Sequence, residues 1–254
     1  MDPILRLDKV CKRFGGVVAA NEETFSVMPG EVRGLIGPNG AGKSTIMNLI
    51  SGIYACDSGS VFFNEKDITS MPAHDRARLG IGRTFQTPRF LQRSSIRENL
   101  LIGTDLGNGF GYLSSYFGKK GANFENELAD LMTYAGFSFD WNDDINGIPF
   151  GQRKLLEIVR TMLSHPKVML VDEPAAGLNR SEVDNVVKLL TVASKERGIG
   201  VILIEHAMDL IMSFCEEIVV INFGKVIASG TPEQVSADTG VIEAYLGRSR
   251  DAAN

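Results

Sequence analysis

A glycine-rich stretch at residues 37–45 constrains the fold of this chain more than any other feature of its sequence. It reads Gly-Pro-Asn-Gly-Ala-Gly-Lys-Ser-Thr and fits G-x-x-x-x-G-K-[ST], a phosphate-binding loop whose backbone N–H groups point at an anion. In that pattern Lys43 can reach the β- and γ-phosphates of a nucleotide, and the Ser44 hydroxyl can bind Mg²⁺. The candidate phosphate-binding residues are Gly37, Pro38, Asn39, Gly40, Ala41, Gly42, Lys43, Ser44 and Thr45.

The sequence on either side of this loop supports the interpretation. Residues 31–36 predict a short strand that enters the loop, and residues 44–50 predict a helix that leaves it. The N-terminus of such a helix presents further N–H groups and a positive partial charge to the anion. The alternative is a glycine-rich turn that binds nothing, and the strand–loop–helix context argues against it.

Length and composition favour one large domain, or one domain with a lobe. The chain has 254 residues, of which 44% are hydrophobic, enough for a substantial core. Its net charge of −5 does not favour a nucleic-acid-binding protein, which would usually carry a basic face. No apolar run approaches the ~20 residues of a membrane span, and residues 1–8 lack the features of a signal peptide.

Cysteine usage indicates a reducing compartment. Cys11, Cys56 and Cys215 are widely spaced and odd in number, which suits free thiols in a reducing environment. We therefore expect a cytosolic protein without a disulfide framework or a cysteine metal site. Contact with a membrane protein stays open.

Turn residues and apolar periodicity give a coarse map of the chain. Residues 3–36 carry strand signals, residues 90–165 are mainly helical, and parallel-sheet signals return after residue 165. The expected helices are 72–79, 95–102, 125–136, 151–163 and 179–197, with one more starting at Thr231. The expected strands include 60–63, 168–171 and 200–204, and a hairpin formed by 218–222 and 225–228.

This order of elements predicts an α/β nucleotide-binding core with a helical lobe inserted between its halves. Within the lobe, the segment 103–121 is rich in glycine and aromatic residues. We expect a long connection there, which is either functional or a surface loop packed by its own aromatic side chains. We assign no chemistry to it.

An acidic pair follows the predicted strand at 168–171. Asp172 and Glu173 come at its carboxyl end, where open α/β sheets place their ligands. Asp172 would hold Mg²⁺ through water, and Glu173 would polarise an attacking water as a general base. Two carboxylates after a strand are often an ordinary exposed turn, so this interpretation depends on the phosphate-binding loop being present as well.

A histidine and a glutamine complete the candidate catalytic set. His206 follows the next strand, and the expected strand order places it beside the acidic pair, where it would contact a γ-phosphate. Gln86 in Arg-Thr-Phe-Gln has an amide that can bind Mg²⁺ or the water. Either residue, taken alone, is more often an ordinary surface side chain.

Taken together, these motifs occur in the order found in ATP-binding cassette (ABC) ATPases, and the chain resembles that family from Leu5 to about Leu246. The resemblance implies a RecA-like P-loop NTPase core with an N-terminal antiparallel β subdomain and an inserted α-helical subdomain. Residues 1–89 and 165–254 would form the core and residues 90–164 the helical subdomain of a single nucleotide-binding domain. By the same resemblance, Phe14 stacks on adenine, Gln86 is the Q-loop glutamine and His206 is the switch histidine.

The signature sequence departs from the family's Leu-Ser-Gly-Gly-Gln. The chain has Ile148 followed by Pro149, Phe150, Gly151 and Gln152, so the serine hydroxyl is missing and a phenylalanine replaces a glycine. The Gly151 N–H and the start of the following helix can still meet a phosphate.

The segment after the acidic pair, Ala-Ala-Gly-Leu-Asn, also departs from the family. Asn179 stands at the usual aspartate position, where it can form hydrogen bonds but carries no charge. These departures, with Phe-Gly-Lys-Val-Ile-Ala-Ser-Gly-Thr-Pro at 223–232, resemble the ATP-binding subunits of branched-chain amino-acid importers.

The resemblance implies an ATP hydrolase that energises import across the cell membrane from its cytoplasmic face. ATP would be held with Mg²⁺ between this chain and a second ATP-binding subunit. The nucleotide would contact Phe14 and residues 37–45 of one subunit and residues 149–152 of the other. The catalytic residues would be Glu173, His206 and Gln86. The residues that bind the metal would be Ser44, Gln86 and Asp172.

Further partners follow from the same resemblance. Transmembrane permease subunits would bind through coupling helices, and a periplasmic or lipid-anchored solute-binding protein would complete the system; no nucleic acid is expected. The alternatives are an importer subunit for an amide or urea, a soluble ABC ATPase of a macromolecular machine, another P-loop class such as a GTPase, and a non-catalytic nucleotide sensor. Intact Glu173 and His206 argue against the last of these.

Overall fold

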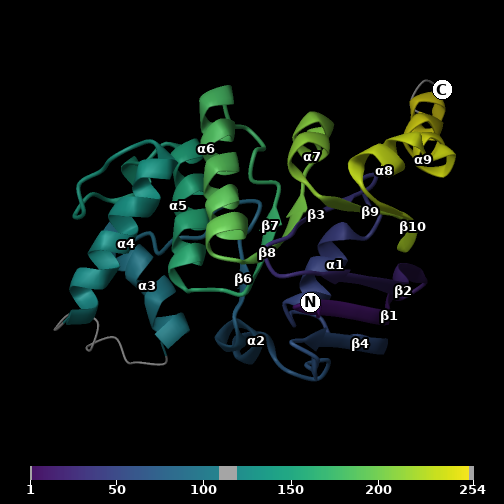
Figure 1. Cartoon of the computed structure of the whole chain (residues 1–254), viewed down its shortest axis with the longest axis horizontal. Coiled ribbons are helices and arrows are strands. Elements are labelled where there is room, and N and C mark those ends of the chain that lie inside the picture. The colour runs from purple at the N-terminus through teal and green to yellow at the C-terminus, as the bar shows by residue number, and fades with distance from the viewer. Residues whose placement is uncertain (1, 109–118, 252–254) are drawn as a thin grey trace.

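The computed structural model describes residues 2–108 and 119–251. In this part of the chain the strands form two sheets, and helices cover the larger sheet and extend beyond it at one end (Figure 1). This is the predicted α/β architecture, with the antiparallel β subdomain that the family resemblance implies.

The smaller sheet forms the β subdomain. It contains β1 (Leu5–Phe14), β2 (Val17–Val27), β4 (Ser58–Phe63) and β5 (Lys66–Asp67), in the order β2-β1-β4-β5 and antiparallel throughout. The expected turn at 14–16 joins β1 to β2, with Phe14 opposite Val17. Apolar side chains that alternate along β1, such as Leu5 and Leu7, are fully buried. The prediction of a strand-rich N-terminal region is confirmed.

The larger sheet contains β3 (Val32–Ile36), β6 (Ile81–Arg83), β7 (Val168–Asp172), β8 (Gly200–Ile204), β9 (Glu217–Asn222) and β10 (Lys225–Gly230). Their order is β10-β9-β3-β8-β7-β6, parallel except that β10 pairs antiparallel with β9 as the predicted hairpin. Every residue of β8 is buried. Parallel strands covered on both faces need apolar side chains throughout, which explains the uninterrupted apolar runs at 168–171 and 200–204.

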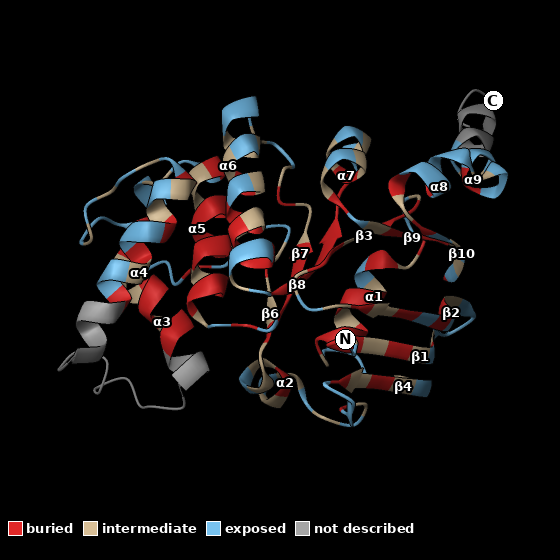
Figure 2. Cartoon of the chain, viewed as in Figure 1, coloured by how far each residue is buried: buried red, intermediate tan, exposed pale blue. Residues whose placement is uncertain are grey.

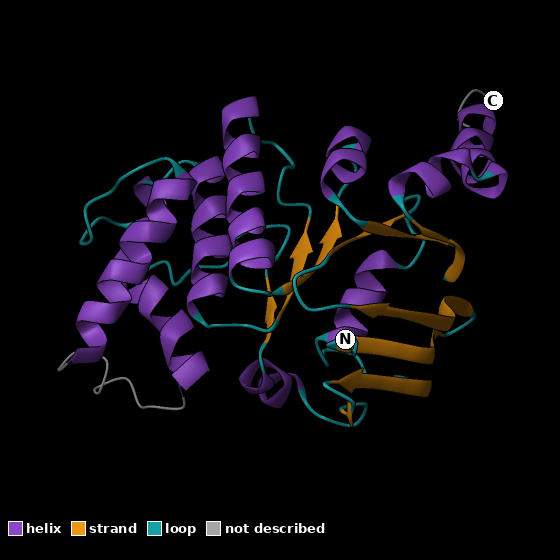
Figure 3. Ribbon diagram, in the orientation of Figure 1, coloured by secondary structure: helices purple, strands orange, loops and turns teal. Residues whose placement is uncertain are grey.

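Helices lie on both faces of this sheet and form a lobe at one end of the molecule (Figure 3). The described helices are α1 (Lys43–Ile50), α2 (Ala73–Leu79), α3 (Ile96–Asn108), α4 (Lys119–Ala135), α5 (Phe150–Leu163), α6 (Arg180–Thr191), α7 (Met208–Phe214), α8 (Pro232–Ala237) and α9 (Thr239–Asp251), with a 3₁₀ turn η1 (Ile145–Gly147) and a π-helical segment η2 (Val192–Glu196). In the lobe α3 and α4 pack on α5, and α6 packs against α4 and α5.

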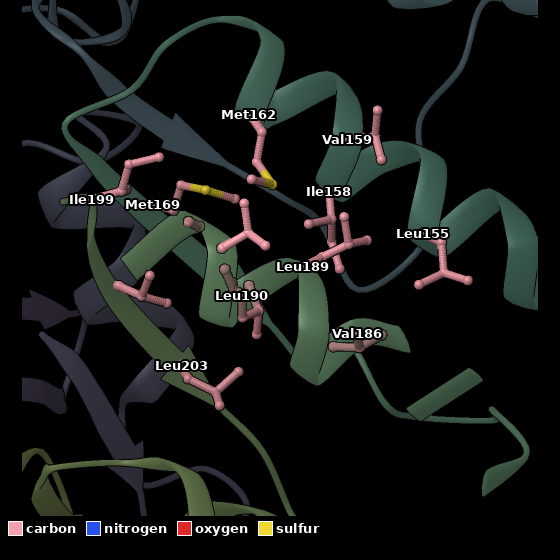
Figure 4. Close-up of a cluster of buried hydrophobic side chains, with 14 of the residues drawn as sticks. Leu155, Ile158, Val159, Met162, Met169, Val186, Leu189, Leu190, Ile199 and Leu203 are labelled. Carbon is pink, nitrogen blue, oxygen red and sulfur yellow. The ribbon is translucent and has the colours of Figure 1, made fainter. Parts of the chain in front are cut away.

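Alternate residues of the larger sheet belong to two separate hydrophobic clusters. Met169 and Leu203 pack with α5 and α6 in the first cluster, which Figure 4 shows in close-up. Leu170 and Ile202 belong to the second, together with α1 and the inner face of the smaller sheet. Figure 2 shows this buried material as red bands along the strands and along α5. The sheet is therefore packed against apolar side chains on both faces.

The predicted connection at 103–121 is wrong at both ends, because α3 continues to Asn108 and α4 begins at Lys119. Gly103 is a helix contact rather than a loop residue: a Cβ there would lie 2.5 Å from the carbonyl oxygen of Arg160 on α5. Only a glycine lets the two helix backbones approach so closely. Residues 109–118 of the predicted connection lie outside the described residues.

Other element predictions hold with shifted limits. The helices expected at 72–79 and 151–163 correspond to α2 and α5, and Thr231 caps α8 in a capping box with Gln234. The helix expected at 179–197 is α-helical only to Thr191 and continues as η2, where the Ser194 hydroxyl donates to the Leu190 carbonyl oxygen at 3.0 Å. Side-chain bonds of that kind bend helices. Strand β6 and helices α7 and α9 were not expected.

Across residues 2–108 and 119–251, no helix combines the length and the apolar character needed to cross a membrane.

Glu23 on β2 places a carboxyl group inside the smaller sheet. It is 0% exposed, and neither of its oxygens meets a hydrogen-bond partner in the described part of the chain. Burial raises the pKa of Glu23 to about 8, and the nearby backbone N–H of Asn21 opposes this only in part. The folded protein therefore holds this proton more tightly than the unfolded chain does.

A pH-dependent stability follows from that difference. The stabilisation from protonated Glu23 is complete below the ordinary glutamate pKa of 4.5 and is lost as the pH rises through about 8. We expect Glu23→Gln to gain on the parent protein in free energy of unfolding between those limits, by at most about 1.4 kcal/mol per pH unit. Urea unfolding at about pH 5 and about pH 8 measures the effect. Glu22→Gln, an exposed neighbour, serves as the control, and a pH-independent difference for Glu23→Gln would contradict the assignment.

Candidate nucleotide-binding site

The phosphate-binding loop, the acidic pair, Gln86 and His206 gather at the carboxyl edge of the larger sheet, whereas Phe14 ends a strand of the smaller sheet and residues 149–152 begin α5. Residues 37–45 follow β3, the acidic pair ends β7, and His206 follows β8, which pairs with both of these strands. Loops that follow neighbouring parallel strands converge at one edge, where α/β sheets bind ligands. The expectation that His206 lies beside the acidic pair is confirmed by this strand order.

The loop at residues 37–45 is held from outside by the β9–β10 hairpin. The Gly224 N–H at the hairpin tip donates to the Ala41 carbonyl oxygen at 2.7 Å, and the Gly224 carbonyl accepts from the Asn21 N–H of β2 at 2.6 Å. Between the loop and residues 17–19 of β2 lies a hollow of about 180 Å³. Both sheets therefore contribute to the surroundings of the loop.

Lys43 and Ser44 begin α1, as the sequence predicts. The Lys43 side chain is buried, and its ammonium group donates to the carbonyl oxygens of Gly37 at 2.7 Å and Pro38 at 3.1 Å. Ser44 lies one residue further and is exposed. A cation held inside the loop together with the first N–H groups of a helix is what an anionic phosphate chain requires.

Glu173 is the meeting point of the predicted catalytic residues. The Gln86 amide donates to its Oε2 at 2.7 Å, and Nε2 of His206 lies 2.9 Å from its Oε1. The Glu173 backbone has φ of 48°, and its N–H donates to the Ile204 carbonyl oxygen at 2.9 Å. A left-handed conformation is strained for a residue with a side chain and is retained where the surroundings enforce it. Three loops thus present one hydrogen-bonded group.

Asp172 is placed as a metal ligand would be. Burial raises the pKa of this carboxyl group, opposed by the nearby cations Arg83 and Lys43. In the part of the chain that the structure describes, no side chain or backbone N–H donates a hydrogen bond to its carboxylate. A half-buried carboxylate without such donors, with the Ser44 hydroxyl and the Gln86 amide oxygen as further ligands, fits what Mg²⁺ prefers.

Phe14 stands at the end of β1 and is 43% exposed. Its ring meets Tyr54 edge-on at 5.2 Å, and the Lys12 ammonium lies 5.6 Å from it. It is therefore not a core residue. An exposed ring face suits stacking on a planar base.

The signature residues begin α5, with Pro149 at the N-cap position and Phe150 42% exposed. Within this chain they lie against the segment after β7: the carboxylate of Glu182 abuts Gly151, where a Cβ would come within 2.2 Å of Oε1. Glu182 also forms a capping box with Asn179, whose side chain accepts from the Glu182 N–H at 3.0 Å. Asn179 therefore caps α6 at the usual aspartate position.

Charged residues that sequence reasoning missed support the site. Arg83 on β6 donates to Asn48 Oδ1 at 2.7 Å and to Ser51 Oγ at 2.9 Å, which ties the strand before Gln86 to helix α1. The buried carboxylate of Glu205 accepts from the N–H groups of Ala175 at 2.6 Å and His206 at 3.1 Å. In the sequence, Arg83 and Glu205 stand close to predicted site residues, and this position was the available indication of their role. It does not show that their charged side chains are buried.

Comparison with known proteins gives matches to two family models and to curated relatives. The family model described as ABC transporter matches residues 20–176, and the one described as branched-chain amino acid ATP-binding cassette transporter matches residues 225–251. The chain is similar to the high-affinity branched-chain amino acid transport ATP-binding protein BraF of Pseudomonas aeruginosa, at 37% identity over 96% of this chain and 98% of that protein. LivG of Escherichia coli K12 is 34% identical over 96% and 98%.

Solved structures give the same result. A crystal structure of an ATP-binding cassette in its ADP conformation matches with a TM-score of 0.82 and 32% identity, over 97% of this chain and 100% of that one. A dimeric cassette in a post-hydrolysis state bound to ADP and Pi matches in fold, with a TM-score of 0.77 and 21% identity over 90% and 98%.

The geometry of the phosphate-binding loop yields a paired test. Gly37 has φ of 153°, and an added Cβ would lie 2.0 Å from the Ile221 carbonyl oxygen. Gly40 has φ of 80° with nothing within 4 Å of that position. We expect Gly37→Ala to lower the free energy of unfolding by at least about 3 kcal/mol and Gly40→Ala by about 1 kcal/mol, measured by urea unfolding. Equal effects of the two substitutions would contradict the close packing of Gly37 on β9.

Proposed function

The chain belongs to the ATP-binding proteins of ABC transporters, in the branched-chain amino-acid group, and from that premise we propose that it hydrolyses MgATP to power import of branched-chain amino acids. The observation that carries the proposal is the Glu173 carboxylate, which holds Gln86 and His206 at the same edge of the sheet as the phosphate-binding loop. This group is suited to moving a proton beside a bound triphosphate.

Binding of ATP would use the loop and its surroundings. The N–H groups of residues 40–45 would surround the β- and γ-phosphates. The Lys43 ammonium would exchange the carbonyl oxygens of Gly37 and Pro38 for phosphate oxygens, which are stronger acceptors because they carry charge. The exposed ring of Phe14 would stack on the adenine.

A magnesium ion fits the oxygen donors of Ser44, Gln86 and Asp172. Bound there with ATP, it would neutralise charge on the phosphates. The Asp172 carboxylate, whose pKa burial raises, would be held in its charged form by such a cation.

Hydrolysis would depend on Glu173. Its carboxylate would accept a proton from the water whose oxygen bonds to the γ-phosphorus, while the bond from that phosphorus to the β–γ bridging oxygen breaks and ADP leaves. Gln86 would orient that water, and His206 would hold Glu173 from the other side and contact the γ-phosphate oxygens. Because the carboxylate is already fixed by two neighbours, little reorganisation is needed at the moment of reaction.

The chain is part of an ABC transporter complex, and we propose which subunits it meets. A second ATP-binding subunit would present its residues 149–152, or their counterpart, to the ATP held by this chain. The first N–H groups of a helix such as α5 have no acceptor within the helix itself, and they suit a γ-phosphate. ATP would then join the subunits and its hydrolysis would release them, since only the triphosphate contacts both.

Permease subunits would dock on the side of the molecule where the lobe meets the core. A hollow of about 380 Å³ lies there, lined by residues of α2, β6, α3 and α5 and of the loop after β6, among them Ala77, Phe85 and Ile102. Its size and apolar walls suit one turn of an inserted helix. Docking there would place the chain at the cytoplasmic face of the membrane, in a system completed by a solute-binding protein.

The division of the chain into a core at residues 1–89 and 165–254 and a helical subdomain at residues 90–164 stays a proposal.

The catalytic role is tested by Glu173→Gln. The amide keeps the shape of the side chain but cannot accept the proton, so we expect ATP to bind with parental affinity and turnover to fall by at least about 100-fold. Titration with ATP and release of phosphate measure the two quantities. The exposed Glu196→Gln is the control. Hydrolysis by Glu173→Gln at the parental rate would remove Glu173 from the mechanism.

The docking proposal is tested on α2. Ala77→Trp fills the hollow, and we expect it to weaken binding of the permease subunits at least about tenfold while ATP affinity stays at the parental value. His74→Trp adds the same ring to an exposed position of the same helix and should leave permease binding unchanged.

Purification with native partners distinguishes the importer function from that of a soluble ATPase. Recovery with ribosomes or DNA and without membrane subunits would contradict the importer function.

A further inference from the structure

Helix α5 carries a row of charged side chains that face the catalytic loops instead of the solvent. Lys154, Glu157 and Arg160 follow one another at intervals of three residues, which places them along one side of the helix. Lys154 is 4% exposed and Glu157 is 2% exposed. Charged side chains are buried this completely only when something is gained by holding them there.

Lys154 holds the loop that contains Glu173. Its ammonium group donates to the carbonyl oxygen of Glu173 at 2.7 Å and to that of Ala176 at 2.8 Å. Together with the N–H bond from Glu173 to Ile204, this fixes both backbone groups of a residue in the left-handed conformation. The carboxylate that meets Gln86 and His206 is therefore aimed by a lysine from the helical lobe.

Glu157 and Arg160 hold the loop that contains Gln86. The Glu157 carboxylate accepts from the Arg89 N–H at 3.5 Å and also interacts with the Phe85 N–H. Arg160 donates to the Arg89 carbonyl oxygen at 2.7 Å and pairs with Glu157 at 3.5 Å. The backbone is thus bound on both sides of Gln86.

The electrostatics of the row agree with a supporting role. Burial lowers the pKa of Lys154, and the carboxylates of Glu205 and Glu173 oppose that shift. Burial raises the pKa of Glu157 to about 7, with the Arg160 guanidinium as the main opposing influence. Each charge is compensated by backbone dipoles and by its neighbours in the row.

We propose that Lys154, Glu157 and Arg160 are positioning residues, through which α5 sets the relative position of Gln86 and Glu173 in its own subunit. The signature helix would then act twice: its first residues serve the neighbouring subunit's ATP, and its charged row aligns the catalytic pair of its own. A displacement of the lobe would move both loops together. This inference rests on the proposed catalytic roles of Gln86 and Glu173.

Hydrogen–deuterium exchange of the full-length chain tests the contacts without relying on hydrolysis. We expect Lys154→Met to speed amide exchange in residues 173–178, and Glu157→Met in residues 85–90, each by at least about tenfold. Lys154→Arg and Glu157→Gln, which keep a donor or an acceptor, should restore part of the protection. Lys188→Met, which changes an exposed lysine on α6 that donates to Asn185 of the same helix, is the control. Exchange at the control level in both segments overturns the proposal, and so does a rise spread over the whole chain.

Kinetics test the consequence for catalysis. We expect Glu157→Met to lower kcat about 10- to 100-fold and to leave the KM for ATP within about threefold. In a Gln86→Ala background the same substitution should have little further effect, because both changes act on one loop. Effects that simply multiply would overturn the positioning role. Loss of turnover in Glu173→Gln is a separate result, so failure of the proposed function would be recognised independently.

Discussion

Two side chains from different loops meet on the carboxylate of Glu173, with the Gln86 amide at 2.7 Å and the His206 imidazole at 2.9 Å. This contact can form only because three neighbouring strands, β6, β7 and β8, end at the same edge of the sheet in that order. The strands in turn are held in register by apolar side chains on both faces. The catalytic arrangement thus depends directly on how the larger sheet is buried.

Polar groups inside the protein convert that architecture into a defined geometry. Arg83 joins the strand before Gln86 to helix α1, Glu205 binds the turn after Glu173, and the charged row of α5 reaches both loops. Each of these groups would be costly to bury unpaired, so each favours a single arrangement of the loop it contacts. The strained backbone at Glu173 is kept in place by such bonds and not by its own preference.

The sequence was sufficient for those parts of the site whose chemistry needs particular residues at particular spacings. The phosphate-binding loop, the acidic pair and His206 could be placed because each follows a recognisable strand. The contacts that support these loops could not be predicted from the sequence. Lys154 and Glu157 have the spacing of an exposed ion pair on a helix, and only the packing of α5 against both loops buries them. In the same way, Gly103 has the character of a loop residue until α5 is seen to lie against it.

The central claim is that Gln86 and His206 act through one carboxylate, and a double-mutant cycle on the chemical step tests it most directly. Single-turnover cleavage of bound ATP would be measured for Gln86→Ala, His206→Ala and the variant with both changes. The account predicts that the double variant is little slower than the slower single variant, because either change already releases Glu173. Rate losses that multiply would show that the two residues act independently and would contradict the account.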